Sequence, residues 1–441
     1  MPDTAAEAPR RHAVDPTVLT LTAYTAVMTA LSARAFLMPG ESLDYLTFLD
    51  PWYRHIASHG GFHALADPDF SDYNVPYLYL LTALTYLPLP ALAGIKWISI
   101  LFDLALAYYA FRIVSRLRPA QPWAAFGAAT VVLFLPTVVT NSGWWGQCDA
   151  LYAAFLVGGI HYVLRHRPWW ACTFFGVALA FKFQAVFLFP FLLVLVLVGR
   201  MPWRSLLAVP AAYLLLDVPA LVLGADPWRL LTVYARQTGT YRLLSVNAPS
   251  VYEFVSAPGD THLVRGVGVL VAGTLVSLLT ASTVWFLRRG RRGLPVSGPD
   301  VPGLTDTRVV LLAACSSIVV PFLLPSMHER YFYVADVLTV LAAFALPRRL
   351  WYVPVLVQLS SFGSYLKCNS AELAPYLSMP AHSALMLLAL SAMVRTTAHE
   401  LRGPRAASYG HAPAAEGTLS PGSSASPASS ASSASPASSA T

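Results

Sequence analysis

The stretch RVVLLAACSSIVVPFLLPSMHERYFYVADVLTVLAAFAL, residues 308–346, places three ionisable side chains between two apolar runs. They belong to His328, Glu329 and Arg330, and each flanking run is close to the length that crosses a bilayer as a helix. Because ionisable groups next to hydrocarbon cost free energy, such a cluster is a functional-site hypothesis by default. The stretch therefore predicts a membrane protein with a polar site where two spans meet.

Composition supports a membrane protein and excludes several other classes. The 441 residues are 56% hydrophobic and only 12% charged, with a mean hydropathy of +0.56, whereas a soluble domain carries about 25% charged residues. The net charge of +7 comes mostly from arginines in short loops, which indicates membrane topology and not nucleic-acid binding. The four cysteines show no CxxC or zinc-ligand spacing, and no disulfide framework is predicted.

Twelve apolar runs are predicted to cross the membrane as helices, because backbone polar groups find no water in lipid. The runs are 17–38, 92–111, 122–140, 149–164, 168–181, 184–199, 203–223, 266–287, 308–324, 331–346, 350–366 and 381–395. Basic clusters such as Arg165 with Arg167, or the arginines of 288–292, recur after every second run and mark cytoplasmic loops. We therefore expect an all-α, multi-pass protein of the cell membrane, with about twelve spans in 17–395 and a cytoplasmic tail over 1–16.

The same alternation puts two long loops, 39–91 and 224–265, on the outer face. In the first loop, side chains at helical spacing predict an amphipathic helix lying on the membrane. The residues with this spacing are Phe48, Trp52, Ile56 and His59. The segment 403–441 is rich in Ser, Ala and Pro, cannot bury a core, and is predicted to be a disordered cytoplasmic tail.

Two predicted spans are too short to cross the membrane fully. Residues 168–199 lie between the cytoplasmic markers Arg167 and Arg200, whereas two full crossings need about 40 residues. We expect these helices to stop partway and meet at 182–184, beside a cavity open to the outer face, because irregular backbone at membrane depth needs protein or water around it. The Lys182 ammonium could extend outward or bind an anion, and we favour the anion.

The acidic residues at the outer junctions each have a structural alternative. Asp44 could act as a general base or be an ordinary loop carboxylate, and composition alone does not separate it from Asp50 or Asp72. Asp72 also precedes Tyr, Asn, Val and Pro, a composition that favours a turn. Asp149 could cap the helix that follows it, and this alternative carries at least as much weight as a catalytic role.

Aromatic and amide side chains suggest a sugar site. Gln147 and the adjacent Trp144 and Trp145 could bind sugar hydroxyls and sugar faces, although tryptophans also form aromatic belts at the membrane surface. Asn247, followed by Ala and Pro, favours a turn when taken alone.

The charged residues inside or between apolar runs fall into two groups. The cluster at 328–330 could form a salt-bridged helix end, but the free-energy cost of its position favours a functional role. Asp103 and Asp217 lie inside apolar runs, and we expect buried hydrogen-bonding partners there in preference to proton or ion sites.

Taken in order, these residues resemble the GT-C superfamily of membrane glycosyltransferases. The resemblance rests on Asp44-Tyr45, Pro51-Trp52-Tyr53, Gly60-Gly61-Phe62, Asp72-Tyr73-Asn74-Val75-Pro76-Tyr77, Trp145-Gly146-Gln147-Cys148-Asp149, Phe181-Lys182-Phe183-Gln184 and His328-Glu329-Arg330-Tyr331. The closest likeness is to bacterial proteins related to the GPI-anchor mannosyltransferases, and the order also matches the dolichol-pathway glucosyltransferases. The chain departs from the latter in one residue inserted between Lys182 and Gln184, and in arginine for lysine at position 330.

The resemblance implies a hexosyltransferase that takes a sugar such as mannose or glucose from a polyprenyl-phosphate-linked donor on the outer leaflet. An acceptor hydroxyl, on a lipid-linked glycan, a glycolipid or a protein, would attack the anomeric carbon with inversion while a carboxylate takes its proton. That base would be Asp44 or Asp50, with Asp44 favoured, and the donor phosphate would be bound by Lys182, His328 and Arg330. The other substrate-binding candidates are Asp72, Tyr73, Trp145, Gln147, Asp149, Gln184, Asn247 and Glu329.

Two other classes also fit a polytopic chain. A transporter or lipid flippase would have a similar number of spans, but it usually carries repeats and a midplane site, and the polar residues here cluster at the outer junctions. A non-catalytic membrane subunit would not need the charged cluster at 328–330. No cofactor is predicted with certainty, since loop carboxylates could hold a divalent metal ion but no ligand spacing identifies one.

Overall fold

The computed structural model describes most of the chain. The described residues are 15–238, 243–255, 261–289 and 304–402. They belong to one compact unit within 1–403. The predicted disordered tail over 403–441 and most of the predicted cytoplasmic tail over 1–16 lie outside the described residues.

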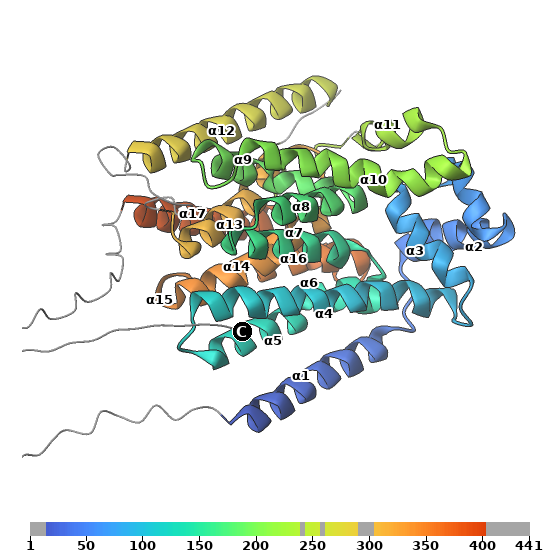
Figure 1. Cartoon of the computed structure of the whole chain (residues 1–441), viewed down its shortest axis with the longest axis horizontal. Helices are drawn as coiled ribbons and strands as arrows, with labels where there is room; N and C mark the ends of the chain where they lie inside the picture. The colour runs from blue at the N-terminus through green and yellow to red at the C-terminus, as the bar shows by residue number, and fades with distance from the viewer. Residues whose placement is uncertain (1–14, 239–242, 256–260, 290–303, 403–441) are drawn as a thin grey trace, which may run out of the picture. The chain divides into compact units, whose positions relative to one another are not determined.

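Within those ranges the chain is built almost entirely of helices (Figure 1). They are α1 (Pro16–Leu37), α2 (Asp50–Ser58), α3 (Val75–Thr85), α4 (Ala91–Leu117), α5 (Pro122–Phe134), α6 (Pro136–Thr140), α7 (Asp149–Leu164), α8 (Pro168–Phe181), α9 (Phe189–Leu197), α10 (Ala208–Leu223), α11 (Pro227–Thr238), α12 (His262–Arg289), α13 (Asp306–Leu323), α14 (Tyr333–Ala345), α15 (Pro347–Leu350), α16 (Val353–Asn369) and α17 (Met379–Arg402). Short π or 3-10 turns that matter below are η1 (Tyr45–Leu49), η4 (Asn141–Trp145), η5 (Phe183–Leu188) and η8 (Glu329–Phe332).

The predicted apolar runs coincide with these helices to within a few residues. In the described part of the chain, five helices are long and apolar enough to cross a membrane, or six if the bent pair Pro122–Phe134 and Pro136–Trp145 counts as one span. Four shorter apolar helices accompany them, over Val75–Thr85, Asp149–Leu164, Pro168–Phe181 and Phe183–Leu197. The prediction of an all-α, multi-pass membrane protein is confirmed, and the number of twelve spans stays a prediction.

Helix α7 lies at the centre of the core and carries Asp149 at its first turn. Nearly all of its side chains are buried, and it contacts α4, α8, α13 and α14. Its Gly158 and Gly159 let α8 approach closely, since a Cβ atom there would lie 2.7 Å from the rings of Phe174 and Phe175. Small residues at contacts of this kind drive helix packing in membranes, where apolar burial is no driving force. Asp149 is therefore held on a rigid element.

The chain breaks between α8 and α9, as predicted from the shortness of the two spans. Helix α8 ends at Phe181, Lys182 adopts an extended conformation with φ −155° and ψ 134°, and a 3-10 turn leads into α9. Lys182 is only 6% exposed. The predicted meeting point at 182–184 is confirmed, whereas a cavity open to the outer face stays a prediction.

The first long loop is mostly helical. Helix α2 forms where the amphipathic spacing predicted it, but Trp52 and Ile56 are buried against protein and α2 contacts α3. Phe48 and His59 are exposed. The expectation that this apolar face lies on the membrane is therefore wrong, because the apolar helix α3 covers it.

The second long loop reaches back to the charged cluster through two short strands. Strand β1 (Ser245–Val246) pairs in parallel with β2 (Met327–His328), with Ser245 opposite Met327 and Val246 opposite His328. The next residue, Asn247, forms a backbone bridge to His328. This pairing holds two segments side by side that are about eighty residues apart in the sequence.

Candidate active site

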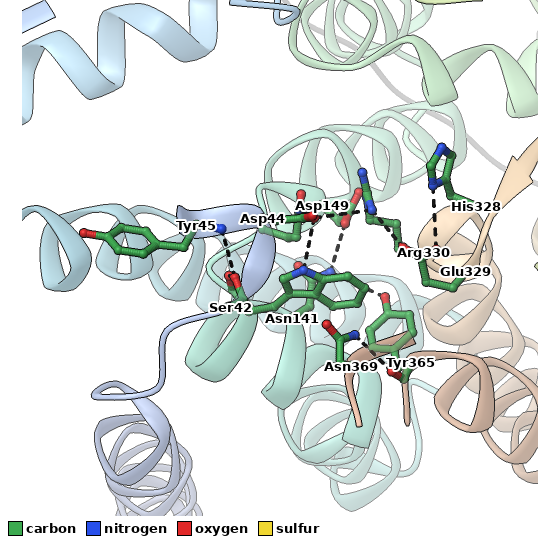
Figure 2. Close-up of polar contacts among 12 residues, drawn as sticks. Ser42, Asp44, Tyr45, Asn141, Asp149, His328, Glu329, Arg330, Tyr365 and Asn369 are labelled. Atoms are coloured by element: carbon green, nitrogen blue, oxygen red, sulfur yellow. Dashed lines mark hydrogen bonds and ion pairs between the residues drawn. The ribbon is translucent and has the colours of Figure 1, made fainter. Parts of the chain in front are cut away.

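Asp44 lies between α1 and α2 and accepts hydrogen bonds from two side chains of one turn. The indole Nε1 of Trp145 donates to Asp44 Oδ2 over 3.1 Å, and the amide of Gln147 donates to the same oxygen. The guanidinium Nη1 of Arg330 lies 3.6 Å from that oxygen (Figure 2). The Asp44 side chain is 23% exposed, so its carboxylate is held in place and is still accessible.

Arg330 lies between two carboxylates. Its Nη1 is 2.8 Å from Glu329 Oε1 as well as near Asp44, and its guanidinium carbon lies 5.7 Å from the centre of the Trp145 ring. Among the described residues, the buried Nε of Arg330 has no hydrogen-bond partner. A guanidinium carries five donors in a planar fork, so a donor remains for an anionic ligand.

Glu329 is kept ionised at the base of this cluster. Burial raises the pKa of its carboxyl, but the neighbouring His328 ring and the charge of Arg330 outweigh burial and lower the pKa below its usual value. The His328 Nδ1 lies 3.7 Å from Glu329 Oε2, and Glu329 is 1% exposed. Figure 2 shows His328, Glu329 and Arg330 arranged in a row that ends at Asp44.

Asp149 and Lys182 form a buried ion pair beside this row. The Lys182 Nζ lies 2.5 Å from Asp149 Oδ1, and Asn141 donates to Asp149 Oδ2 over 2.9 Å. The rings of Tyr73 and Tyr152 each lie 5.8 Å from the Lys182 ammonium. Lys182, expected to meet a bound anion, thus has a carboxylate partner. The alternative of Asp149 as a helix cap is wrong, because it is the first residue of α7 and its side chain pairs with Lys182 and Asn141.

The turn at 145–147 joins the two halves of the site. Gly146 has φ +76°, a left-handed conformation that glycine adopts without strain. This conformation allows Trp145 and Gln147 to reach Asp44 from the same turn. The Tyr73 hydroxyl donates to Gln147 Oε1 over 3.4 Å, which links the turn to the aromatic wall of Lys182.

Of the remaining candidate residues, two lie beside the site and two lie away from it. Asn247 lies against His328 with φ +54°, and Gln184 is buried with an unpartnered Oε1 among the described residues. Asp50 lies outside the network, since its carboxylate pairs with Arg54 over 2.8 Å and accepts from Tyr45. Asp72 is exposed, and its backbone oxygen accepts from the Gln237 side chain.

Arg34 and Asp103 form a buried ion pair that the sequence analysis did not predict, and it packs behind the candidate site. Arg34 Nε lies 2.8 Å from Asp103 Oδ2, and the Ser142 hydroxyl donates to the same oxygen over 2.5 Å. Tyr333 also donates to Asp103. The expected role of Asp103 as a buried hydrogen-bonding partner is confirmed, and Asp217 likewise accepts from an amide, that of Asn74. The presence of one arginine and one aspartate in two different apolar runs was the signal for such a pair.

The loop that carries Asp44 is anchored at two points. The buried Lys96 ammonium donates to the backbone oxygens of Met38 and Gly40 over 2.8 and 2.5 Å. The Ser42 hydroxyl donates to the backbone oxygen of Trp145 over 2.7 Å. Since π-turn η1 begins directly after Asp44, these contacts fix where the carboxylate points.

No group of three or more His, Cys, Asp or Glu side chains is placed to hold a metal ion in the part of the chain that the structure describes. The site instead combines three carboxylates, from Asp44, Asp149 and Glu329, with the cations of Lys182 and Arg330. A held carboxylate can accept a proton, and an arginine with a free donor can bind phosphate. The arrangement therefore suits proton abstraction beside an anionic leaving group.

Residues 70–298 match the model of glycosyltransferase family 87. The chain belongs to glycosyltransferase family 87. A search of curated proteins gives no match. Among solved structures, the fold resembles that of ArnT from Cupriavidus metallidurans bound to undecaprenyl phosphate, with a TM-score of 0.50 and 14% identity over 87% of this chain and 77% of that chain.

Family membership confirms the predicted class of GT-C membrane glycosyltransferase, and the transporter and non-catalytic alternatives lose their support. The matched segment contains Tyr73, the 145–149 turn and Lys182, whereas Asp44 and the 328–330 cluster lie outside it. The candidate site therefore combines residues inside and outside the matched segment.

Proposed function

We propose that this family 87 glycosyltransferase moves a hexose, such as mannose or glucose, from a polyprenyl-phosphate-linked donor to an acceptor hydroxyl, with inversion. The observation that carries the proposal is Arg330, which lies within 3.6 Å of Asp44 and keeps a buried donor without a partner. A proton acceptor and a phosphate-binding group thus lie side by side. The similar ArnT structure is bound to undecaprenyl phosphate, a lipid phosphate of the proposed donor class.

Asp44 is the proposed base. In the transfer step the acceptor oxygen forms a bond to the anomeric carbon, the bond from that carbon to the phosphate oxygen breaks, and the acceptor proton moves to the Asp44 carboxylate. The hydrogen bonds from Trp145 and Gln147 orient this carboxylate and both reach one oxygen, Oδ2. The second oxygen, Oδ1, is the one we assign to the acceptor hydroxyl.

Arg330 is the proposed phosphate ligand, assisted by His328. A positioned cation stabilises the negative charge that develops on the leaving phosphate, and a guanidinium can bind two phosphate oxygens at once. Glu329 orients Arg330 through the 2.8 Å contact. The Lys182 ammonium is paired with the Asp149 carboxylate. It would contact the donor phosphate as a second cation only if that phosphate displaces Asp149 from it.

The aromatic and amide residues around these charges are the proposed sugar site. Tyr73, Trp145 and Gln147 already contact one another or Asp44, and Gln184 has a buried oxygen that a sugar hydroxyl could satisfy. Asn247 joins them through its backbone bridge to His328. The arginine pattern supports an extracytoplasmic position for this site, and the proposed acceptor is a lipid-linked glycan, a glycolipid or a protein.

A matched pair of variants tests the base. Asp44→Asn should still bind a polyprenyl-phosphate hexose and should lose transfer by about 100-fold or more. Asp50→Asn removes a carboxylate that pairs with Arg54 outside the network, so it should transfer at close to the wild-type rate. Transfer by the first variant with loss in the second would move the base to Asp50, and transfer by both would exclude either carboxylate as the base.

A further inference from the structure

An apolar cavity lies between α9, α12, α13 and α17, apart from the candidate active site. It holds about 970 Å³ of empty space, part of it open to the surroundings. Its walls are mainly aliphatic and aromatic, from residues such as Phe191, Val194, Val276, Leu279, Val319 and Val394. Because these helices belong to the membrane-spanning part, the ligand that this lining fits is a hydrocarbon chain.

The length of the cavity matches one leaflet of a bilayer. Along α12 its lining extends from Val276 to Phe286, which corresponds to about 15 Å at the rise of an α-helix. The hydrocarbon core of a bilayer is about 30 Å thick. The cavity therefore has the depth of the acyl chains of one leaflet. It is too short for an extended polyprenyl chain whose phosphate lies at the candidate active site.

One end of the cavity is basic. Arg402, the last residue of α17, lines it and lies with its guanidinium carbon 5.6 Å from the centre of the Phe286 ring. Arg289 lies three residues beyond Phe286 on α12, with its guanidinium over Trp285 at 5.0 Å. In the described ranges neither arginine has a carboxylate within ion-pair distance, and the nearby acid Glu400 is paired with Arg349.

This basic end lies on the membrane side opposite the candidate active site according to the arginine pattern. Helices α12 and α17 both end there, whereas Asp44 follows the opposite end of α1. A second cavity on the other side of α12 is lined by Arg288 and Arg289, which extends the basic surface. Basic pockets between membrane helices on the cytoplasmic side bind acidic lipid head groups.

We propose that this cavity binds one anionic phospholipid of the leaflet opposite the candidate active site. An acyl chain would lie along α12 between α13 and α17, and the head-group phosphate would contact Arg402. Surrounding lipid is as apolar as the cavity walls, so Arg402, with the basic surface beside it, supplies the selectivity for an anionic head group. The lipid would join α12 to the rest of the bundle and takes no part in glycosyl transfer.

Photolabelling of the full-length protein in nanodiscs tests the proposal. The probe is phosphatidylglycerol with a diazirine in one acyl chain, compared with the matching phosphatidylcholine. Wild-type protein should be labelled by the anionic probe within 276–286, saturably and severalfold more than by the zwitterionic one. Arg402→Ala should lose most of this preference. Arg395→Ala, an exposed arginine on the same helix that does not line the cavity, should keep it.

Four outcomes would overturn the proposal. Equal labelling by the two probes, or unchanged labelling in Arg402→Ala, would show ordinary boundary lipid. Displacement of the probe by polyprenyl phosphate, but not by unlabelled phosphatidylglycerol, would make the cavity part of the donor site. A rise in labelling when the chain is shortened after Arg402 would make the chain's own C-terminal segment the occupant. Binding is measured without transfer, so the result is independent of the proposed function.

Discussion

The buried pair of Lys182 and Asp149 gives the sharpest energetic prediction. Both side chains are almost fully buried, at 7% and 0% exposed, and their charges meet at 2.5 Å. Removal of one partner of a buried ion pair costs about 3–5 kcal/mol, because the other charge is left uncompensated. Asp149→Asn should lower the free energy of unfolding more than Lys182→Met does. In the Lys182→Met variant the remaining Asp149 carboxylate still accepts a hydrogen bond from Asn141 and lies at a helix N-terminus, which favours negative charge.

Thermal unfolding in detergent, followed with a thiol-reactive dye, measures the loss. The exposed Cys368 reacts in the folded protein and gives a constant background, whereas the buried Cys148 and Cys172 react when the core opens. At about 2 °C per kcal/mol, the value for larger domains, each single variant should melt roughly 6–10 °C below the wild type. The double variant should recover most of the loss, because replacement of a whole buried pair by neutral groups is often close to neutral.

An exposed ion pair supplies the control. Asp50→Asn breaks the contact with Arg54, whose side chain is 77% exposed. Exposed pairs contribute about 0–1 kcal/mol, so this variant should melt close to the wild type. If the two single variants of the buried pair behave like this control, or if the double variant loses the sum of both, the pair is not coupled and the reasoning fails.

Single contacts and the arginine pattern support four further predictions. Arg330→Lys should weaken donor binding at least tenfold, because an ammonium lacks the planar fork for phosphate, and wild-type donor affinity would exclude Arg330 as the ligand. Asp103→Asn should lower the melting temperature and leave donor affinity unchanged if the protein folds, because Asp103 supports the site without touching it. Because folding lowers the pKa of Glu329, this carboxylate stabilises the fold above its unfolded pKa of about 4.3, and the stabilisation is lost as pH falls through the lower folded pKa. Glu329→Gln should therefore make the melting temperature depend less on pH at the acid end. Membrane-impermeant labelling should reach Ser58→Cys, at an exposed position in the predicted outer loop 39–91, and miss Gly290→Cys, and the reverse pattern would invert the predicted topology.

The positions of the helices could be predicted from the sequence because they depend on local composition. The apolar runs predicted where the helices lie. Because residues 168–199 are too few for two full crossings, they also predicted the break at 182–184. The placement of α2 could not be predicted, because its apolar face is satisfied equally by lipid or by protein. The choice depends on α3, which follows it in the same loop.

Which side chains meet could be predicted only in part. The order of motifs pointed to Asp44, the 145–149 turn, Lys182 and the 328–330 cluster as one site, and the structure brings them together. The partner of Lys182 could not be predicted, because an extended backbone at the break turns its side chain toward α7. Asn247 was weak as a sequence signal, and only the pairing of β1 with β2 places it beside His328.

The most direct test of the account is a transfer assay with purified wild-type protein. The protein is placed in liposomes with a polyprenyl-phosphate hexose labelled in the sugar, and a membrane extract supplies the acceptors. The account predicts that label moves to an acceptor with the opposite anomeric configuration, that free polyprenyl phosphate is released in equal amount, and that Asp44→Asn abolishes both. Movement of intact labelled lipid across the bilayer, without release of polyprenyl phosphate, would contradict the account and would favour a flippase.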